Sequence, residues 1–532
     1  MAKNGVTAVV SKLKKLDIVL FLVLVAIGIV GTSVPLFDMD EGAFLEASRE
    51  MLETKQWSVT TLDGQARYDK PILAYWFQSF FLWAFSPFYG VISIETIGRL
   101  PSIIAGSLWV LVLAKFTLEQ TQCKNTALFV GTVCLTSLGT SIIHRAATAD
   151  ALLNLFLVLI LCDLIRYQLN PTYKLRLRLF FWASLGLITK GPVAIIIPFG
   201  ASFLFSLNNF SWQWFKEIIL CKTGWLILCI ITIPWLISVW NIQGSSFLSQ
   251  FLLHHNFERF TGNLHGHGGF IGYVFLILPL IMLPFTGLII AIFCNLGRLW
   301  KSKLDQFCLL WCFWALLLVS LSGTQLPHYI LYSTPGLFLL FGRVLPTIKS
   351  KWWALPGIFF PLFMMILWLI PEKVFKLFEP NSTSEHLEMT ITILNYKKQA
   401  FLTLIPVILV CLYSLFSKQL KLDKRLLYQG AAQFILVTTL LIPAISNFRQ
   451  LPVKEAALIA KGANAKVVSV GIRKPSFSFY RQSITEQRLP RPDSKEWVLV
   501  SSEESSNLIE EFGPFKERVS NSRWLLLEPR ND

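Results

Sequence analysis

Carboxylates, cations and aromatic side chains occur together in four short segments of the sequence. These segments are Phe37-Asp-Met-Asp-Glu41, Tyr68-Asp-Lys70, Thr148-Ala-Asp150 and Pro327-His-Tyr329. A carboxylate such as Asp40 or Glu41 can act as a general base toward a hydroxyl group, and a lysine can bind a phosphate. Each segment also has a structural interpretation, because an aspartate ahead of a helix can cap it. These segments therefore contain candidate site residues, and their sequence fits both a catalytic or binding role and a helix-capping role.

Charged residues also stand at the ends of apolar runs. Lys70 precedes an aromatic stretch, where it is either a snorkelling anchor or a phosphate-binding cation. Asp150 opens one run and Lys190 closes another, so each fits either a helix-dipole role or a ligand contact at a membrane boundary. The aromatic residues near these charges fit either an interfacial belt or the mouth of a cavity. They are Tyr68, His328 and Tyr329.

A polar loop at 254–269 carries the remaining candidates. Arg259 has the forked guanidinium that suits a phosphate. His265 and His267 form a His-x-His pair that, together with Asp69, fits a divalent metal such as zinc. Spacing fixes no third ligand, and a flexible Gly-rich surface is the alternative interpretation of this loop.

Long apolar runs make up most of the chain and must position these residues. Of its 532 residues, 54% are hydrophobic and 15% are charged, whereas soluble domains carry about 25% charged residues. An uncharged run such as 18–37 forms a helix of about 30 Å, which matches the hydrocarbon core of a bilayer. The run 71–89 is rich in Trp and Phe, and we expect an interfacial or re-entrant segment there. The sequence predicts about thirteen transmembrane helices, at 17–37, 98–118, 125–143, 149–167, 177–190, 191–208, 219–240, 268–296, 305–322, 328–347, 352–371, 399–416 and 426–445.

Basic residues between the runs predict the orientation of the chain. The amino terminus and the short loops at 166–178, 298–303, 343–351 and 418–425 are basic, so we expect them in the cytoplasm. This pattern also explains the net charge of +16, and the absence of one basic domain argues against a nucleic-acid partner. All seven histidines then lie on the outer face or at its edge, while the nine cysteines lie elsewhere, so disulfides are not expected outside.

The outer face is predicted to hold two further structured parts. The loop 38–97 contains an amphipathic helix in the interface, with apolar residues on one face of 44–52, and Asp38 and Asp40 as its caps. Residues 446–532 have more charges and three strand-like segments, at 466–472, 497–501 and 524–527. We therefore expect an all-α polytopic membrane domain at 1–445 and a small extracytoplasmic α/β domain at 446–532.

The sequence contains no P-loop and no dinucleotide fingerprint. An enzyme with its candidate residues on the outer face has no cytoplasmic nucleotide donors, so we expect an activated group carried by a membrane lipid. A transporter or lipid flippase is the alternative, and it predicts polar residues near the bilayer midplane and paired repeats with broken helices. A non-catalytic assembly partner is a third interpretation.

Over residues 17–347 the chain resembles the bacterial aminoarabinose transferases. These enzymes form part of the protein O-mannosyltransferase-like branch of the GT-C glycosyltransferases. The sequence departs from the family in having Asp69, where Glu is frequent, and a single proline, Pro71. The motifs that carry the resemblance are Asp40-Glu, Glu46-Ala-Ser-Arg-Glu-Met-Leu, Tyr68-Asp-Lys-Pro, Arg99-Leu-Pro-Ser, Thr148-Ala-Asp-Ala-Leu, Thr189-Lys-Gly-Pro, Arg259-Phe and Leu326-Pro-His-Tyr-Ile-Leu.

The resemblance implies inverting transfer of a sugar from a polyprenyl (undecaprenyl) phosphate to a lipid or protein acceptor. The reaction would take place on the outer side of a bacterial inner membrane, where lipopolysaccharide modification is one such process. Asp40 matches the catalytic carboxylate, with Glu41 beside it, and Asp150 matches a second acidic position that we assign to sugar or acceptor positioning. Lys70 and Arg259 match the residues that hold the donor phosphate. The other expected substrate contacts are Tyr68, Lys190, His328 and Tyr329, and the family's zinc position maps to Asp69 with His265 and His267.

Overall fold

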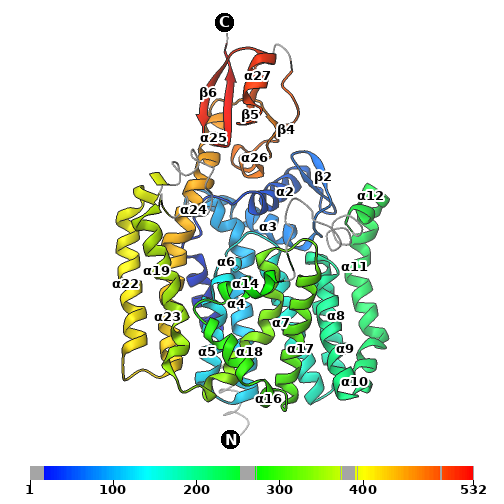
Figure 1. The fold of residues 1–532 in the computed structure, drawn as a ribbon. Coiled ribbons are helices and arrows are strands. Elements are labelled where there is room, and N and C mark those ends of the chain that lie inside the picture. The colour runs from blue at the N-terminus through cyan, green and yellow to red at the C-terminus, as the bar shows by residue number, and fades with distance from the viewer. Residues whose placement is uncertain are drawn as a thin grey trace, which may run out of the picture.

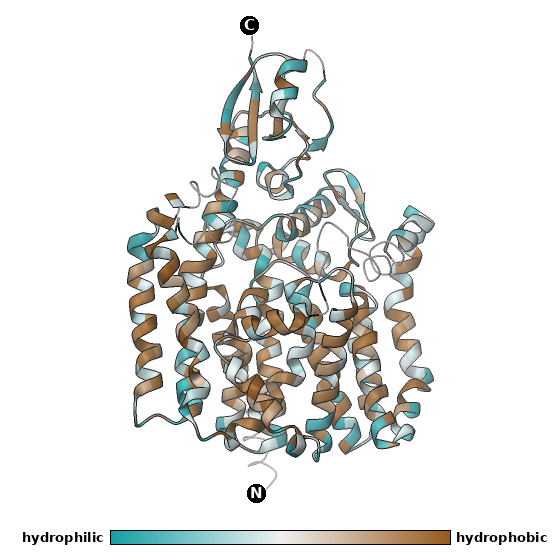
Figure 2. Ribbon diagram, in the orientation of Figure 1, coloured by the Kyte–Doolittle hydropathy of each residue, from teal (hydrophilic) through white to brown (hydrophobic). Residues whose placement is uncertain are grey.

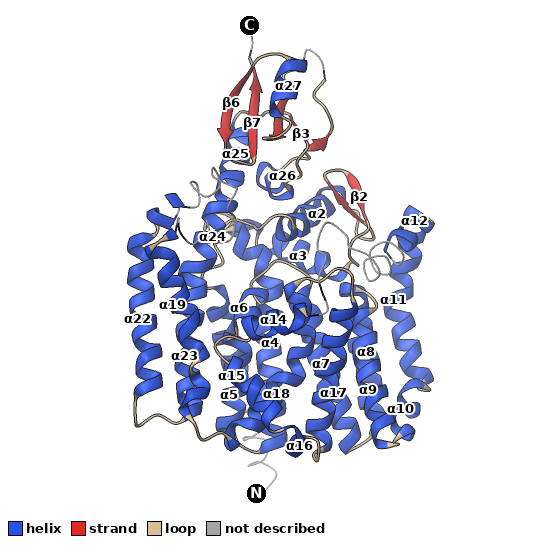
Figure 3. Ribbon diagram, viewed as in Figure 1, coloured by secondary structure: helices blue, strands red, loops and turns tan. Residues whose placement is uncertain are grey.

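The computed structural model describes residues 17–251, 270, 272–371, 373, 390–391, 393–491 and 494–530. A bundle of long helices makes up most of the protein, and a small domain with strands stands at one end of it (Figures 1 and 3). The helices of the bundle are mostly hydrophobic along their length, whereas the small domain is mixed (Figure 2). This arrangement confirms the predicted mostly helical polytopic fold with small carboxy-terminal strands.

The amino-terminal half begins with the helix Asp17–Ile29. The elements that follow are α2 (Asp40–Thr54), β1 (Thr60–Leu62), β2 (Gln65–Arg67), α3 (Leu73–Ala84), η1 (Ser86–Phe88), α4 (Ile94–Thr121), α5 (Lys124–Thr136), α6 (Leu138–Ile143), α7 (Asp150–Leu169), α8 (Tyr173–Lys190), α9 (Val193–Asn209), α10 (Trp212–Ile219), α11 (Lys222–Gln243) and α12 (Ser245–Leu248).

The second half of the bundle has shorter and more broken helices. They are α14 (Tyr273–Ile281), α15 (Thr286–Cys294), α16 (Leu296–Leu299), α17 (Lys303–Leu321), η3 (Pro327–Ser333), α18 (Thr334–Val344), η4 (Leu345–Thr347), η5 (Lys351–Ala354), α19 (Pro356–Leu369), α22 (Lys397–Phe416), α23 (Leu422–Leu436), η6 (Val437–Leu441) and α24 (Ile442–Arg449).

Seven helices of the described chain are long and apolar enough to cross a membrane. The pair α14 and α15 makes an eighth if the two are one span, although they bend by 119° at a break that contains Pro284. Proline lacks the N–H that a continuous helix requires, which accounts for a break at this position. Each of the thirteen predicted spans overlaps a helix or consecutive helical pieces, although the first is helical only over Asp17–Ile29, and their number as true spans stays a prediction. The seven are α4, α7, α11, α17, the run Lys351–Leu369, α22 and the run Leu422–Arg449.

Helix α3 lies in the aromatic run 71–89 and is too short to be a span. Its 12 residues extend about 18 Å, against about 30 Å for the hydrocarbon core. It packs against α2 at the end of the bundle that carries the small domain (Figure 1). This placement supports the interfacial interpretation of the run.

Helix α2 forms where predicted, but its environment differs from the prediction. Its polar residues Glu46, Arg49 and Glu50 are buried, because the carboxy-terminal domain and the hairpin of β1 and β2 both pack on α2, where the sequence suggested a solvated face. Glu46 is compensated by an ion pair with Arg49 at 2.6 Å. The capping prediction was wrong, since no side chain caps α2 and the Asp38 carboxylate instead binds Ser476.

The carboxy-terminal domain contains the three predicted strands in one five-stranded mixed sheet. The strand order is β4-β3-β5-β7-β6, with β3 parallel to β4 and β5, and β7 antiparallel to β5 and β6. The elements are α25 (Leu451–Gly462), β3 (Val467–Val470), α26 (Pro475–Arg481), β4 (Glu486–Gln487), β5 (Trp497–Ser501), α27 (Ser505–Phe512), β6 (Phe515–Ser520) and β7 (Trp524–Pro529).

One apolar core joins this domain to the membrane part. Phe477 and Trp497 of the domain are buried in the same cluster as Leu45 of α2, Leu82 of α3 and Ile97 of α4. Burial of apolar side chains on both sides favours a fixed orientation of the two parts. The domain is therefore held against the α2–α3 end of the bundle.

A buried ion pair between Arg99 of α4 and Glu41 of α2 fixes the chain around the first outer segment. The guanidinium donates to both Glu41 oxygens, at 2.8 and 2.5 Å, and to the backbone carbonyls of Thr32 and Val34, both at 2.7 Å. Glu41 also accepts the backbone N–H of Ala147 at 2.7 Å. The pair thus connects α2 and α4 with the segments before α2 and before α7.

Replacing Arg99 by Ala is expected to destabilise the protein strongly, because Glu41 would remain buried without its cation. Removal of one partner of a buried ion pair costs about 3–5 kcal/mol. The measurement is the apparent melting temperature of the purified protein in detergent. Lys115→Ala, which removes a largely exposed ion pair with Asp17, serves as control and should melt near the wild-type temperature. Equal melting of the Arg99 variant and wild type would contradict the assignment.

Candidate functional site

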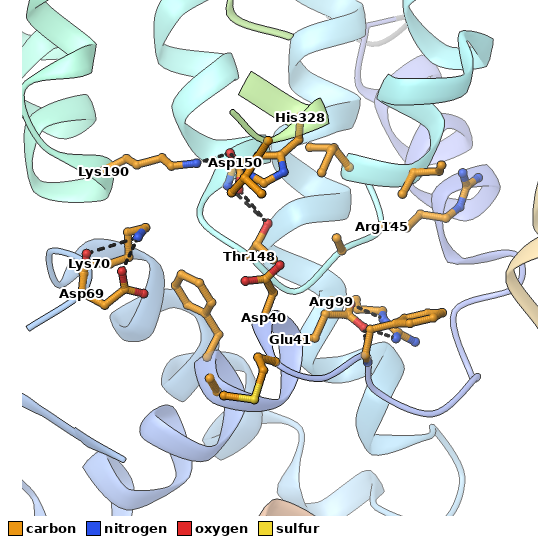
Figure 4. Close-up of a pocket in the computed structure, with 18 of the residues that line it drawn as sticks. Asp40, Glu41, Asp69, Lys70, Arg99, Arg145, Thr148, Asp150, Lys190 and His328 are labelled. Atoms are coloured by element: carbon orange, nitrogen blue, oxygen red, sulfur yellow. Dashed lines mark hydrogen bonds and ion pairs between the residues drawn. The ribbon is translucent and has the colours of Figure 1, made fainter. Parts of the chain in front are cut away.

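A cavity of about 780 Å³ lies at the end of the bundle that carries the small domain, among the segments that hold the predicted site residues. Nine of those residues line it, although they come from five separate parts of the sequence. Figure 4 shows how the charged ones face a common space. The nine are Asp40, Glu41, Tyr68, Asp69, Lys70, Asp150, Lys190, His328 and Tyr329.

Asp40 differs from the other carboxylates of the cavity in having no protein partner. It occupies the first turn of α2, is exposed to the cavity, and forms no hydrogen bond or ion pair with any residue that the structure describes. Its carboxylate points into the space between Lys70 and Asp150 (Figure 4). By contrast, Glu41 is bound by Arg99, and Asp150 by Lys190. Asp40 is therefore the carboxylate that can accept a proton or a hydrogen bond from a substrate.

Asp150, Lys190 and His328 form a charged group on the far side of the cavity. Asp150 opens α7, and its carboxylate pairs with Lys190 at the end of α8. His328 Nε2 lies 3.8 Å from the same Asp150 oxygen. Lys190 Nζ also lies 4.8 Å from the centre of the Tyr329 ring, a cation–π distance. The helix-dipole interpretation and the ligand interpretation of Asp150 and Lys190 are compatible, because the pair sits at helix ends and also lines the cavity.

Lys70 and Asp69 stand opposite this group, just before α3. Lys70 Nζ donates to the Asp69 carboxylate at 2.6 Å, and Arg67 of β2 donates to its other oxygen at 3.0 Å. Arg67 is largely buried, which works against its charge, but the carboxylates of Asp69 and Asp40 favour the cation and raise its pKa. Arg67 of β2 and Lys70, which follows the hairpin, thus place two cations around one carboxylate at the cavity edge.

The donor set for a metal at Asp69 is incomplete within the described residues. Both Asp69 oxygens bind cations of the chain, and a zinc ion would have to displace one of them. His265 and His267 lie outside the described residues, as does Arg259. The predicted zinc site and the phosphate contact of Arg259 therefore stay predictions.

Four further arginines line the cavity and were not among the predicted site residues: Arg67, Arg99, Arg145 and Arg473. Arg145 follows His144 and precedes the candidate segment Thr148-Ala-Asp150, so its position in the sequence could have suggested a place in the site. All three of its donor nitrogens bind backbone carbonyls, and the guanidinium lies 4.3 Å from the centre of the Phe434 ring. No sequence pattern indicated Arg473 as a site residue, because it reaches the cavity only through the packing of the carboxy-terminal domain on α2.

One wall of the cavity is apolar and faces the outside of the bundle. Ile142 at the end of α6 and Ile445 of α24 line the cavity, and both are more than a third exposed on the protein surface. In a bilayer such side chains meet lipid tails. The cavity therefore combines a charged interior with an apolar side that a lipid chain can approach.

The sequence is similar to several known membrane proteins. Residues 17–242 match the family model of dolichyl-phosphate-mannose-protein mannosyltransferases. An undecaprenyl phosphate-alpha-4-amino-4-deoxy-L-arabinose arabinosyl transferase from Erwinia tasmaniensis is 29% identical over 306 residues, 56% of this chain and 53% of that protein. An uncharacterised protein from Aquifex aeolicus is 27% identical over 354 residues, 65% of this chain and 76% of that protein. The chain thus spans about half the length of the arabinosyl transferases it matches.

The fold matches over almost the whole chain. The crystal structure of ArnT from Cupriavidus metallidurans bound to undecaprenyl phosphate superposes with a TM-score of 0.77, at 16% identity, over 97% of this chain and 98% of that one. The apo structure of the same protein gives 0.74. The chain therefore shares the fold of ArnT over almost its whole length, and over part of its length it is similar in sequence to the mannosyltransferase family model and to the arabinosyl transferases.

Proposed function

We propose that this protein transfers a sugar from a polyprenyl phosphate to a lipid or protein acceptor on the outer face of a bacterial inner membrane. The observation that carries the proposal is the unpartnered Asp40 carboxylate in a cavity lined with cations. The fold of a membrane glycosyltransferase family and the apolar wall at Ile142 and Ile445 support it. The relatives' names specify an undecaprenyl phosphate carrier and an aminoarabinose sugar, and from them we take the carrier class and leave the sugar open.

In the proposed reaction Asp40 acts as the general base. It takes the proton of the acceptor hydroxyl while the acceptor oxygen bonds to the anomeric carbon of the sugar, and the bond from that carbon to the phosphate oxygen breaks. Attack from the side opposite the phosphate inverts the anomeric configuration. If the acceptor is itself a phosphate, no proton needs removal, and Asp40 instead orients the acceptor. The products are the glycosylated acceptor and the free polyprenyl phosphate.

The leaving phosphate gains negative charge as the bond breaks, so cations are needed there. Lys70 stands at the cavity edge, and it is the described residue that we assign to this phosphate, with Tyr329 as a helper and Arg259 as a second cation. A fixed cation stabilises charge that develops in the transition state without reorganising at the moment of reaction. We derive no step through a metal, because Asp69 is already bound by Arg67 and Lys70.

Asp150, Lys190 and His328 are assigned to positioning the sugar or the acceptor. Because Lys190 compensates the charge of Asp150, the pair offers oriented donors and acceptors to hydroxyl groups. Glu41 is assigned to positioning as well, since Arg99 occupies both of its oxygens. Tyr68, with its ring centre 6.4 Å from that of Phe247, extends the aromatic edge near Lys70.

The proposal includes a topology of thirteen spans with a cytoplasmic amino terminus. The carboxy-terminal domain then lies outside, against the same end of the bundle as the cavity (Figure 1). The basic loops at 298–303 and 418–425 support this orientation through the positive-inside rule.

Asp40→Asn should abolish most of the transfer, because an amide cannot accept the acceptor proton. General-base contributions are about 10²- to 10⁴-fold in rate. The measurement is transfer of labelled sugar from a polyprenyl phosphate sugar in membranes, with mass analysis of envelope glycolipids and glycoproteins from cells with and without the protein. Glu53→Gln, at an exposed position of the same helix, is the control and should retain activity. Wild-type turnover by the Asp40 variant would remove Asp40 from its role, and substrate flux without a covalent product would favour a transporter.

Lys70→Met should raise the donor KM and lower kcat, because the phosphate loses a charge-assisted contact in both the ground and transition states. Loss of such a contact corresponds to about tenfold or more. Initial rates at varied donor concentration measure both constants, and Lys174→Met at the start of α8, exposed and away from the cavity, is the control. An unchanged donor KM and kcat would show that Lys70 does not contact the phosphate.

A reporter enzyme that is active only outside the cytoplasm should be active when fused after residue 530, and inactive when fused within 418–421. The charge pattern of the loops sets both expectations. Activity at both sites, or at the loop alone, would overturn the proposed topology.

A further inference from the structure

The carboxy-terminal domain binds the turn that precedes Asp40. Ser476, at the start of α26, donates its backbone N–H to Asp38 Oδ1 at 2.9 Å and its hydroxyl to Oδ2 at 2.6 Å. One residue of the domain thus occupies both oxygens of Asp38, two positions before Asp40.

The two segments meet at backbone contact. A Cβ atom at Gly42 would lie 2.7 Å from the Ser476 nitrogen and would also collide with the Asp38 carboxylate. Only glycine avoids this collision, so the close approach of α26 to the first turn of α2 depends on Gly42.

The same domain binds the hairpin that leads to Lys70. Arg473 donates to the Leu62 carbonyl at 3.2 Å and to Asp63 at 3.4 Å, and Ser478 donates to the other Asp63 oxygen at 2.6 Å. Arg473 also lines the cavity. The segment 473–478 therefore touches both chain segments that carry the charged residues of the site.

We propose that this segment of the carboxy-terminal domain is a positioning part of the transferase site, with Ser476 setting Asp40 through Asp38. This role rests on the transferase function proposed above, in which the carboxy-terminal domain has no assigned part. Asp40 is held between two anchored acids, Asp38 bound to Ser476 and Glu41 bound to Arg99. Since α2 has no side-chain cap, these two attachments fix the direction of its first turn. A displacement of about 1 Å at a reacting group costs up to 10²-fold in rate.

The Asp38 attachment also bears on the pH dependence. Burial raises the pKa of Asp38 to about 6, with the Lys474 ammonium and the two Ser476 donors opposing the shift and the Asp63 carboxylate adding to it. Because this pKa is higher than that of a solvated carboxyl, the fastened turn binds the proton more tightly than a released turn would. Lowering the pH through about 6 therefore favours the fastened turn, and titration of Asp38 should add no acid limb to the kcat profile.

Ser476→Ala should lower kcat about tenfold, because one of the two hydrogen bonds to a charged group is lost. The donor KM should stay near the wild-type value, since Lys70 and its neighbours are unchanged. Ser476→Thr keeps the hydroxyl and should restore kcat. Ser505→Ala removes a hydrogen bond to Ser502 inside the same domain, and it is the control.

Asp38→Asn gives a second test that does not depend on the Ser476 variant being stable, because it removes the charged acceptor of both Ser476 donors from the other side of the contact. It too should lower kcat and leave the donor KM near the wild-type value. Wild-type kcat in both Ser476→Ala and Asp38→Asn would overturn the positioning role. Wild-type protein assayed in parallel separates the two proposals. Absence of transfer by wild type contradicts the proposed function, whereas active wild type with both variants equally active contradicts only the positioning role.

Discussion

The ion pair between Arg99 and Glu41 is the constraint on which the cavity end of the bundle depends. A guanidinium and a carboxylate that are both withdrawn from water are costly unless every donor and acceptor is satisfied. Here the Arg99 guanidinium also binds three backbone carbonyls, and Glu41 also accepts two backbone N–H groups. The charged pair therefore specifies the path of the chain through four segments. Asp40 directly precedes Glu41, so the same ion pair also fixes the position of Asp40 in the cavity.

The carboxylates of the cavity fall into two groups, those paired with a cation and Asp40. The carboxylates of Glu41, Asp69 and Asp150 are each paired with a cation, so they shape the site without leaving buried charge uncompensated. Asp40 stands apart because it is exposed to the cavity and needs no protein partner. A polar interior beside an apolar wall suits a molecule with a charged head and a lipid tail. The division of charge thus suits the lipid-linked substrate proposed above.

Much of this arrangement could be predicted from the sequence, and the failures have a common cause. The runs of apolar residues predicted where helices form, and the three strand-like segments predicted the carboxy-terminal sheet. Local patterns could not show that α26 covers α2, so they misplaced the polar face of α2 and gave Asp38 a capping role. Arg473 was missed for the same reason, since its part in the cavity comes from a contact between residues more than 400 positions apart.

The junction of Asp38 with Ser476 has a consequence for how the protein matures. The two residues are 438 positions apart, so the second is synthesised long after the first. In the proposed topology, Ser476 reaches the outer face only after the thirteenth predicted span has been inserted and the carboxy-terminal domain has been translocated. Until then the turn that carries Asp40 lacks its attachment to Ser476. Under the proposed positioning role, a partly inserted chain would therefore transfer sugar slowly.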